Sequence, residues 1–330
     1  MKKIDSEIAL ANLREQLQVS EGKNKQLFRL IRRLERERDA SIQFGVKRVE
    51  RIIPMPSSGK SEATAVVLCS DWHIEERVVS GTVSGLNEYN LEIAEQRANK
   101  FWRTTARMIH IYKRDIPIKN IVLWLGGDFI SGNIHEELLE TCELPPVEAA
   151  ILAQNWLASG IQYLLDHTDC AIEVPCSIGN HSRITAQTRV STEKGNSLEL
   201  FVYHALANHF RGNKRVHFIL PEGYHTYVKV YDKTLRFHHG HGTKYQGGVG
   251  GIFIPAFKSI AQWNKGRVAD LDCFGHWHSA KDGGNFVLNG SLIGYNAYAL
   301  SIKADFEKPR QLFFLMDSQR GKTLTCPIIV

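Results

Sequence analysis

Short apolar runs that end in Gly, Asp, Asn or His recur along the chain from about residue 63 onward. They read ATAVVLCS, KNIVLWLGGD, CAIEVPCSIGN, RVHFILPEG, TYVKVYD, TLRFHHGH, LDCFGHWH, NFVLNGSL and QLFFLMD. Most are rich in β-branched residues, which is typical of buried strands that deliver polar residues at their C-terminal ends. Helix-like stretches near 91–112, 147–166 and 196–210 lie between the runs. The pattern predicts a layered α/β fold.

The first 45 residues have a different character and predict a helical segment. No proline occurs from about residue 3 to 40, and strong helix formers dominate. Spacings of three and four alternate as in the a and d positions of a coiled coil, through Leu10, Leu13, Leu17, Ser20, Asn24, Leu27, Ile31 and Leu34. Self-association into a homodimer and packing of this helix on the rest of its own chain are both open, and Gly22 could divide it in two.

Residues 46–62 contain IIPMPSSGKSE, which is typical of a linker, so we expect one further domain over 63–330. No apolar run approaches the length of a membrane span, and no secretory signal is recognisable, which favours a cytoplasmic protein without a membrane partner. The formal net charge of +6 would suit a polyanionic partner, although a solvated basic surface is the more common explanation of such an excess.

Five of the predicted strand ends carry residue types that bind metal ions. In SDWH and GHWH, two such residues are separated by one position, so their side chains project to the same side of an extended turn. A single motif of this kind is weak evidence, because a turn aspartate and an incidental histidine explain it as well. The candidate ligands are Asp71, His73, Asp128, Asn180, one histidine of the HHGH run (His238, His239 or His241), His276 and His278.

The order of these motifs, DxH, GD, GNH, HGH and GHxH, resembles the calcineurin-like metallophosphoesterase superfamily throughout residues 63–290. The resemblance implies two β-sheets sandwiched by helices and a phosphoester hydrolase with two metal ions. It places one ion on Asp71, His73 and His278 and the other on Asn180, His239 and His276, with Asp128 bridging them. Mixed nitrogen and oxygen ligands suit Mn²⁺, which we favour, or Fe, Zn²⁺ or Ni²⁺.

Two ions would convert a bridging water into hydroxide and neutralise the charge of the transition state. The resemblance also assigns His181 to the leaving group. Protein Ser/Thr phosphatases of the superfamily have Asp, Arg and an acidic residue where this chain has Ser131, Gly132 and Ser182. His181 therefore lacks its usual carboxylate partner unless a nearby residue replaces it; the candidates are His135, Glu136 and Glu137. This departure disfavours a protein phosphatase.

Three polar residues near the predicted mouth are candidates for substrate binding: Arg183, His241 and Lys244. Each is equally well explained as a surface or loop residue. The segment 241–266 mixes glycines, basic residues and aromatics, which fits either a mobile loop over an extended substrate or a buried aromatic cluster under a Gly-rich turn. Together with the positive net charge of the chain, this segment favours a phosphodiesterase or nuclease acting on nucleic acid.

Two stretches, GGDFISGNIHEE and LNGSLIGYNAYAL, also resemble phosphoesterases of bacteriophages, including those similar to double-strand-break repair nucleases. Two alternatives stay open. One is a phosphatase or phosphodiesterase of small nucleotides or phosphoproteins, and the other is a non-catalytic scaffold that retains a metal site. The complete set of ligands argues against the scaffold.

Overall fold

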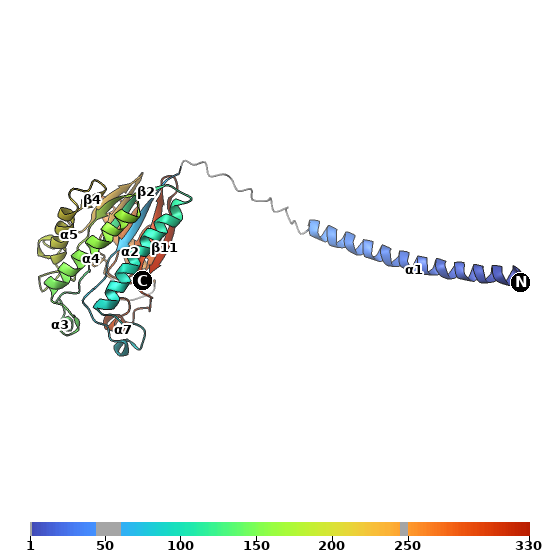
Figure 1. The fold of residues 1–330 in the computed structure, drawn as a ribbon, viewed down its shortest axis with the longest axis horizontal. Coiled ribbons are helices and arrows are strands. Elements are labelled where there is room, and N and C mark those ends of the chain that lie inside the picture. The colour runs from blue at the N-terminus through green and yellow to red at the C-terminus, as the bar shows by residue number, and fades with distance from the viewer. Residues whose placement is uncertain (1, 44–60, 245–249) are drawn as a thin grey trace. The chain divides into compact units, whose positions relative to one another are not determined.

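Two β-sheets lie at the centre of residues 61–330 in this computed structural model, which describes residues 2–43, 61–244 and 250–330 (Figure 1). The larger sheet has the order β11 (Gly321–Ile329), β10 (Arg310–Asp317), β1 (Ala63–Cys69), β2 (Ile118–Leu125), β3 (Ala171–Pro175) and β4 (Val216–Ile219). Strands β1 to β4 run parallel, whereas β10 and β11 are antiparallel to their neighbours.

The smaller sheet has the order β5 (Thr226–Val230), β6 (Lys233–Phe237), β7 (Leu271–Phe274), β9 (Phe286–Leu288) and β8 (Lys281–Asp282). Its three central strands, β6, β7 and β9, are parallel. Parallel strands end at the same edge of a sheet, so the loops that follow β6 and β7 meet there.

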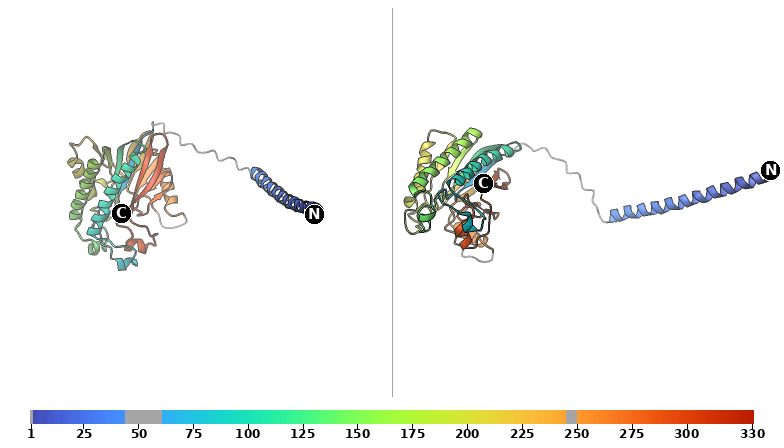
Figure 2. Two further views of the ribbon diagram at one scale, coloured as in Figure 1. Left: turned by 45° about the vertical axis from the view of Figure 1, so that its right-hand side comes forward. Right: turned by 60° about the horizontal axis from the view of Figure 1, so that its bottom comes forward.

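Each sheet is covered on both faces, which explains the continuous apolar runs of the sequence. In β1, alternate residues such as Val67 pack on the helical side, and Val66 and Leu68 pack between the sheets against Phe237 and Val287. Helices α2 (Leu91–Lys113), α4 (Pro146–His167) and α5 (Leu198–His209) cover the larger sheet (Figure 2). Helix α6 (Phe253–Trp263) covers the smaller one. The predicted α/β fold of two sheets sandwiched by helices is confirmed.

Helix α6 corrects one interpretation of the sequence. The segment 241–266 was expected to form a mobile loop or to cover an aromatic cluster, and residues 253–263 are helical. The rings of Phe253 and Phe257 each lie 5.4 Å from that of Phe286. The mobile-loop interpretation is therefore wrong for these residues. An aromatic cluster is present, although Phe257 is exposed and not buried as expected. Residues 245–249 of the glycine-rich stretch lie outside the described residues.

The chain divides into two units, Met1–Ser58 and Gly59–Val330. In the first unit, helix α1 (Lys2–Gln43) confirms the predicted N-terminal helix and continues through Gly22 without a break. The apolar residues of the coiled-coil pattern are exposed in this single chain; they are Leu10, Leu13, Leu17, Leu27, Ile31 and Leu34. Most of the predicted linker, residues 46–60, lies outside the described residues. None of the described helices is both long and apolar enough to cross a membrane.

The remaining elements are short. They are η1 (Ser80–Val83), α3 (Leu138–Thr141), η2 (Lys194–Asn196) and α7 (Ala297–Ser301). They lie in the connections between the strands and helices above, two of them in the long segments that follow β1 and β2. These connections leave the strand ends of both sheets, where the candidate ligands lie.

Candidate metal centre

The loops that follow β1, β2, β6 and β7 are joined by backbone hydrogen bonds. The amide of Asp71 donates to the carbonyl of Gly127 at 2.9 Å, which connects the first two loops. The amide of Gly275 donates to the carbonyl of His239 at 2.7 Å, and the amide of Leu292 donates to the carbonyl of Asp71 at 3.0 Å. Loops from both sheets are therefore held against one another at one place.

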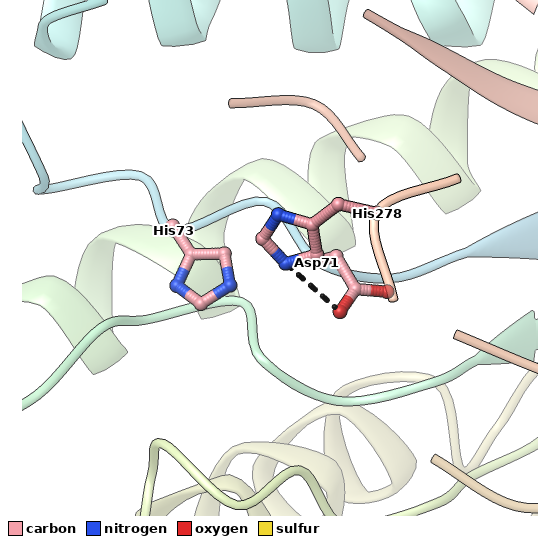
Figure 3. Close-up of side chains that lie close together, drawn as sticks. All are labelled: Asp71, His73 and His278. Atoms are coloured by element: carbon pink, nitrogen blue, oxygen red, sulfur yellow. Dashed lines mark ion pairs between the residues drawn. The ribbon is translucent and has the colours of Figure 1, made fainter. Parts of the chain in front are cut away.

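Three overlapping groups of side chains at this place have the composition of metal sites. Their ligand atoms lie within 4.8 Å of one another in each group; the groups are Asp71, His73 and His278, then His73, Asp128 and His181, and then Asp128, His239 and His276. Figure 3 shows the first group, in which His278 Nε2 lies 3.4 Å from Asp71 Oδ1. Because His73 and Asp128 are each shared by two groups, the three groups form one continuous row of seven residues. We call it the metal row.

Most of these residues have a strained backbone. A left-handed φ occurs at Asp71 (57°), His73 (49°), Asp128 (53°), His276 (72°) and His278 (49°). Only three other non-glycine residues of the described chain share this conformation. Such a conformation costs on the order of 1–3 kcal/mol per residue, and it persists where surrounding contacts impose it, which is most often at functional sites.

The glycines of the motifs allow the carboxylates to approach the neighbouring loops. A Cβ atom on Gly179 would lie 2.1 Å from Asp128 Oδ1, and a Cβ atom on Gly275 would lie 2.3 Å from Asp71 Oδ2. Any larger residue would push these carboxylates away. The glycine of GNH and the glycine of GHxH are therefore needed for the geometry of the site itself.

Two buried atoms of the site have the chemistry of cation ligands. Neither His73 Nε2 nor Asn180 Oδ1 has a hydrogen-bond partner among the described residues, although both are buried. Buried polar atoms are normally paired, and an imidazole nitrogen and an amide oxygen are both metal ligands. Burial, together with the neighbouring His181, lowers the pKa of His73 well below its usual value, so its ring is neutral. The residues present therefore fit a divalent cation.

A hydroxyl relay fixes the tautomer of His73. The hydroxyl of Ser131 donates to Glu76 Oε2 at 2.9 Å, and it lies 2.9 Å from His73 Nδ1. Since the hydroxyl hydrogen is directed at the carboxylate, the Ser131 oxygen accepts from Nδ1–H. The lone pair of His73 is then on Nε2, the atom that belongs to the metal row. Ser131 thus fixes the orientation of the His73 ring.

His239 is oriented in the same way by a carbonyl group. Its Nδ1–H donates to the carbonyl of Gly126 at 2.8 Å, so Nε2 faces Asp128 Oδ2 at 2.9 Å. Burial opposes a charge on this ring, but the neighbouring Asp128 carboxylate raises the pKa of His239 to about 10. Without a cation the ring holds a proton on Nε2, and a bound cation would replace that proton.

The two aspartates are held by further hydrogen bonds. Asp71 Oδ2 accepts from the hydroxyl of Ser70 at 2.5 Å, and Oδ1 accepts from the amide of His276 at 2.9 Å. Asn289 donates to that hydroxyl at 2.9 Å. Asp128 Oδ1 accepts from the amide of His181 at 2.8 Å. Both carboxylates are thereby fixed before any ion binds.

Two buried glutamates support the loops, and the motifs gave no signal for them. Glu199 accepts from the amide of Phe129 at 2.9 Å and from that of Gly179 at 2.8 Å, so it ties the GD loop to the GNH loop. Burial and the Asp128 charge raise the pKa of Glu199 to about 7. Glu75 accepts from the amides of Ser131 and Gly132, and burial raises its pKa to about 7.

His181 is oriented by a backbone carbonyl instead of a carboxylate. Its Nδ1–H donates to the carbonyl of Ser131 at 3.0 Å, and its ring centre lies 4.7 Å from that of His73. The three residues considered as replacement partners are exposed; they are His135, Glu136 and Glu137. His135 is near, with its ring centre 6.0 Å from that of His181, and the described chain shows no hydrogen bond between these two rings.

The candidate residues for substrate binding lie in different settings. Arg183 donates to the carbonyls of Asn180 and Thr185, so it organises the GNH loop. His241 lies outside the three ligand groups; its Nε2 is 2.9 Å from Glu193 Oε1, and its ring centre is 5.5 Å from that of His239. Lys244 is exposed.

His238, the other histidine of the HHGH cluster, is not in the metal row. It is fully buried, and its ring stacks on Phe274 with a centroid distance of 5.0 Å. Consecutive side chains of an extended segment point to opposite sides, which explains why His239 and His238 lie in different surroundings.

No protein-family profile and no curated protein matches the sequence significantly. Several solved structures are similar at a low level. Wild-type Vps29 of Entamoeba histolytica complexed with Zn²⁺ has 11% identity and a TM-score of 0.33, over 80% of this chain and 99% of that chain. A Streptococcus pneumoniae protein described as a predicted phosphoesterase has 11% identity and a TM-score of 0.30, over 77% of this chain and 83% of that one. Sulfate thiohydrolase SoxB of Thermus thermophilus has 9% identity and a TM-score of 0.32, over 84% and 58%.

Proposed function

We propose that the protein is a calcineurin-like metallophosphoesterase that hydrolyses phosphoesters with two divalent transition-metal ions. The observation that carries this proposal is the row of three overlapping ligand groups, in which Asp128 is shared. The residues of the row occur along the chain in the order of the superfamily motifs. One ion would be held by Asp71, His73 and His278 and the other by Asn180, His239 and His276, with Asp128 between them. Mn²⁺ is the ion we favour, with Fe, Zn²⁺ or Ni²⁺ as alternatives.

Bound ions would supply the positive charge that activates water and stabilises the phosphoryl oxygens in the transition state. The chain itself prepares that chemistry. Glu76, Ser131 and the carbonyl of Gly126 hold two imidazoles in the tautomers that present Nε2 to the row. The left-handed backbone of five residues of the row holds their side chains toward one another.

His181 is assigned to the leaving group. Its Nδ1–H is directed at the carbonyl of Ser131, so only Nε2 can exchange a proton with a substrate. In the protonated ring, Nε2 carries the hydrogen that the leaving oxygen needs. The side chain is half-buried, so it is accessible to a substrate at the metal row.

The substrate class that we favour is a phosphodiester of nucleic acid, as in a nuclease. The positive net charge supports a polyanionic substrate, and the pattern Ser131, Gly132 and Ser182 departs from that of protein phosphatases. The phage-type resemblance, including that to double-strand-break repair nucleases, supports the same class. Phosphatase or phosphodiesterase activity on small nucleotides or phosphoproteins is the alternative. A non-catalytic scaffold is disfavoured because a ligand-type residue is present at every one of the proposed metal-binding positions.

A panel of substrates tests this proposal. With Mn²⁺ present, the protein is expected to hydrolyse bis(p-nitrophenyl) phosphate faster than p-nitrophenyl phosphate and to cleave single-stranded or duplex DNA. EDTA should remove the activity, and Mn²⁺ should restore it. Hydrolysis of the aryl monoester or of cyclic nucleotides alone would favour the small-nucleotide alternative. No metal-dependent hydrolysis of any of these compounds would refute the enzyme assignment.

We further propose that α1 forms a parallel coiled-coil homodimer. Its apolar a and d residues are exposed in the single chain, and Asn24 at a seam position can pair with its symmetry mate. Light scattering of the full-length protein should give twice the mass of one chain. The double variant Leu17→Glu/Leu27→Glu should give a single-chain mass, whereas the matched variant Val19→Glu/Gln26→Glu, at exposed positions outside the seam, should remain dimeric. A monomeric full-length protein would contradict this proposal.

A further inference from the structure

Helices α2 and α4 run side by side over the larger sheet (Figures 1 and 2). Side chains of both helices line a groove. Its volume is about 470 Å³. The polar side chains that line it are Arg103, Arg107, His110, Arg114, Tyr163 and His167. None of them belongs to the metal row or supports it.

The lining of this groove contains basic side chains and no acidic ones. The basic residues on the α2 side follow one another at spacings of four, three and four, so they form a stripe about 16 Å long on one face of the helix. None of the three arginines makes an ion pair with a described carboxylate, and no carboxylate lines the groove. The acidic side chains near the facing end of α4 are already engaged: Asp166 accepts from Gln162, and Asp169 pairs with Lys113.

An aromatic pair lies opposite this stripe. The rings of Tyr163 and His167 stack with a centroid distance of 3.9 Å and an interplanar angle of 24°. His167 Nδ1–H donates to the carbonyl of Tyr163 at 2.9 Å, which holds the imidazole in place, and His167 is exposed. Arginines next to a flat aromatic surface are suited to bind phosphates and to stack on a base. An acidic peptide would use the charges but not the aromatic surface.

The groove is remote from the metal row. Its basic stripe lies in the second half of α2, close to the start of β2, whereas Asp128 follows the end of β2. The eight residues of β2 span about 26 Å. A small aryl ester bound at the metal row cannot reach the groove. A nucleic-acid strand has one phosphate per about 3.4 Å, so about ten nucleotides or more are long enough to contact both.

We infer that this groove binds the sugar–phosphate backbone of a nucleic acid at a distance from the cleaved bond. The inference rests on the proposed nuclease function, because it names a second contact for the same substrate. The groove contributes affinity and the metal row contributes cleavage. Neutralising the groove therefore weakens the binding of long nucleic acids and leaves the hydrolysis of small esters unchanged.

The test compares two triple variants of the full-length protein. The groove variant is Arg103→Gln/Arg107→Gln/Arg114→Gln, and the matched variant, with the same change of charge at scattered exposed positions, is Arg211→Gln/Lys229→Gln/Arg320→Gln. Binding of a fluorescein-labelled 20-nucleotide DNA, single-stranded or duplex, is measured by anisotropy in EDTA at several salt concentrations. Rates with bis(p-nitrophenyl) phosphate and Mn²⁺ are measured in parallel.

The groove variant is expected to bind DNA roughly 10²-fold more weakly at low salt, and its slope of log affinity against log salt should fall by about 2–3. The matched variant should stay close to the wild type, and both variants should keep the wild-type rate on the aryl diester. Tyr163→Ala should weaken the binding of single-stranded DNA more than that of duplex DNA, because only unpaired bases are free to stack. Arg107→Gln alone should lower the slope by about 1.

Equal DNA affinity and slope in the groove variant and the matched variant would overturn the inference. Competition by polyglutamate as effective as that by unlabelled DNA would overturn it too, since it would indicate a general polyanion surface. Failure of the proposed function gives a different result: the wild type would cleave no phosphodiester. If the groove variant then bound DNA in EDTA more weakly than the wild type, the groove would still be supported as a nucleic-acid site.

Discussion

Replacing Asp128 with asparagine is expected to abolish both metal binding and hydrolysis. Asp128 is shared by two of the three ligand groups, and its oxygens are fixed by the amide of His181 and by His239. An amide has one oxygen fewer and no charge, so it cannot serve two cations. The wild type should contain up to two ions per chain by metal analysis, and the variant should lose both, with a rate lower by roughly 10³-fold or more.

Asp317→Asn is the matched control for this prediction. Asp317 is also buried, but it lies at the end of β10, where it accepts from Ser61 and from the amides of Gln319 and Arg320. That variant should keep its metal content and its rate. Full metal content and full activity in Asp128→Asn would refute the assignment of the bridging ligand.

Replacing His181 with alanine is expected to lower turnover by roughly 10²-fold or more while the metal content stays unchanged. The physical reason is that Asn180 has the buried, unpaired oxygen suited to a ligand, whereas His181 presents Nε2 to the substrate. The loss should shrink with an activated aryl leaving group, because such a group needs little protonation. Rates with esters of different leaving-group pKa, together with metal analysis, measure both effects.

His135→Ala is the control for His181. His135 is exposed, and its ring centre lies 6.0 Å from that of His181, so it should contribute little to turnover. Loss of metal from His181→Ala would contradict the assigned role. It would instead make His181 a ligand, in agreement with its place in the group with His73 and Asp128.

The strands of the fold could be predicted where they are buried on both faces. The run from Ala63 to Cys69 has no exposed residue, so its sequence is continuously apolar and easily recognised. Strand β11 was not predicted, because most of its residues are only half-buried and Pro327 interrupts the pattern. Helix α6 was not predicted either, because the glycines before it favoured a loop.

The metal row was accessible to sequence analysis because its residues occur in short motifs at strand ends. Its supporting residues were not accessible, because the contacts join distant parts of the chain. Glu199 and Phe129 are 70 residues apart, and Ser131 and Glu76 are 55 residues apart. The left-handed φ angles of Asp71 and four other residues of the row are also invisible in a sequence, since aspartate and histidine adopt them more often than most residues but still at a minority of positions. The basic groove was missed because it is formed by the stripe on α2 and the aromatic pair on α4, which are distant in the sequence.

Anomalous diffraction from crystals grown with Mn²⁺ tests the central claim most directly. The account predicts two anomalous peaks, one beside Asp71, His73 and His278 and the other beside Asn180, His239 and His276, with Asp128 in contact with both. A single peak, or peaks that do not involve Asp128, would contradict the two-metal site.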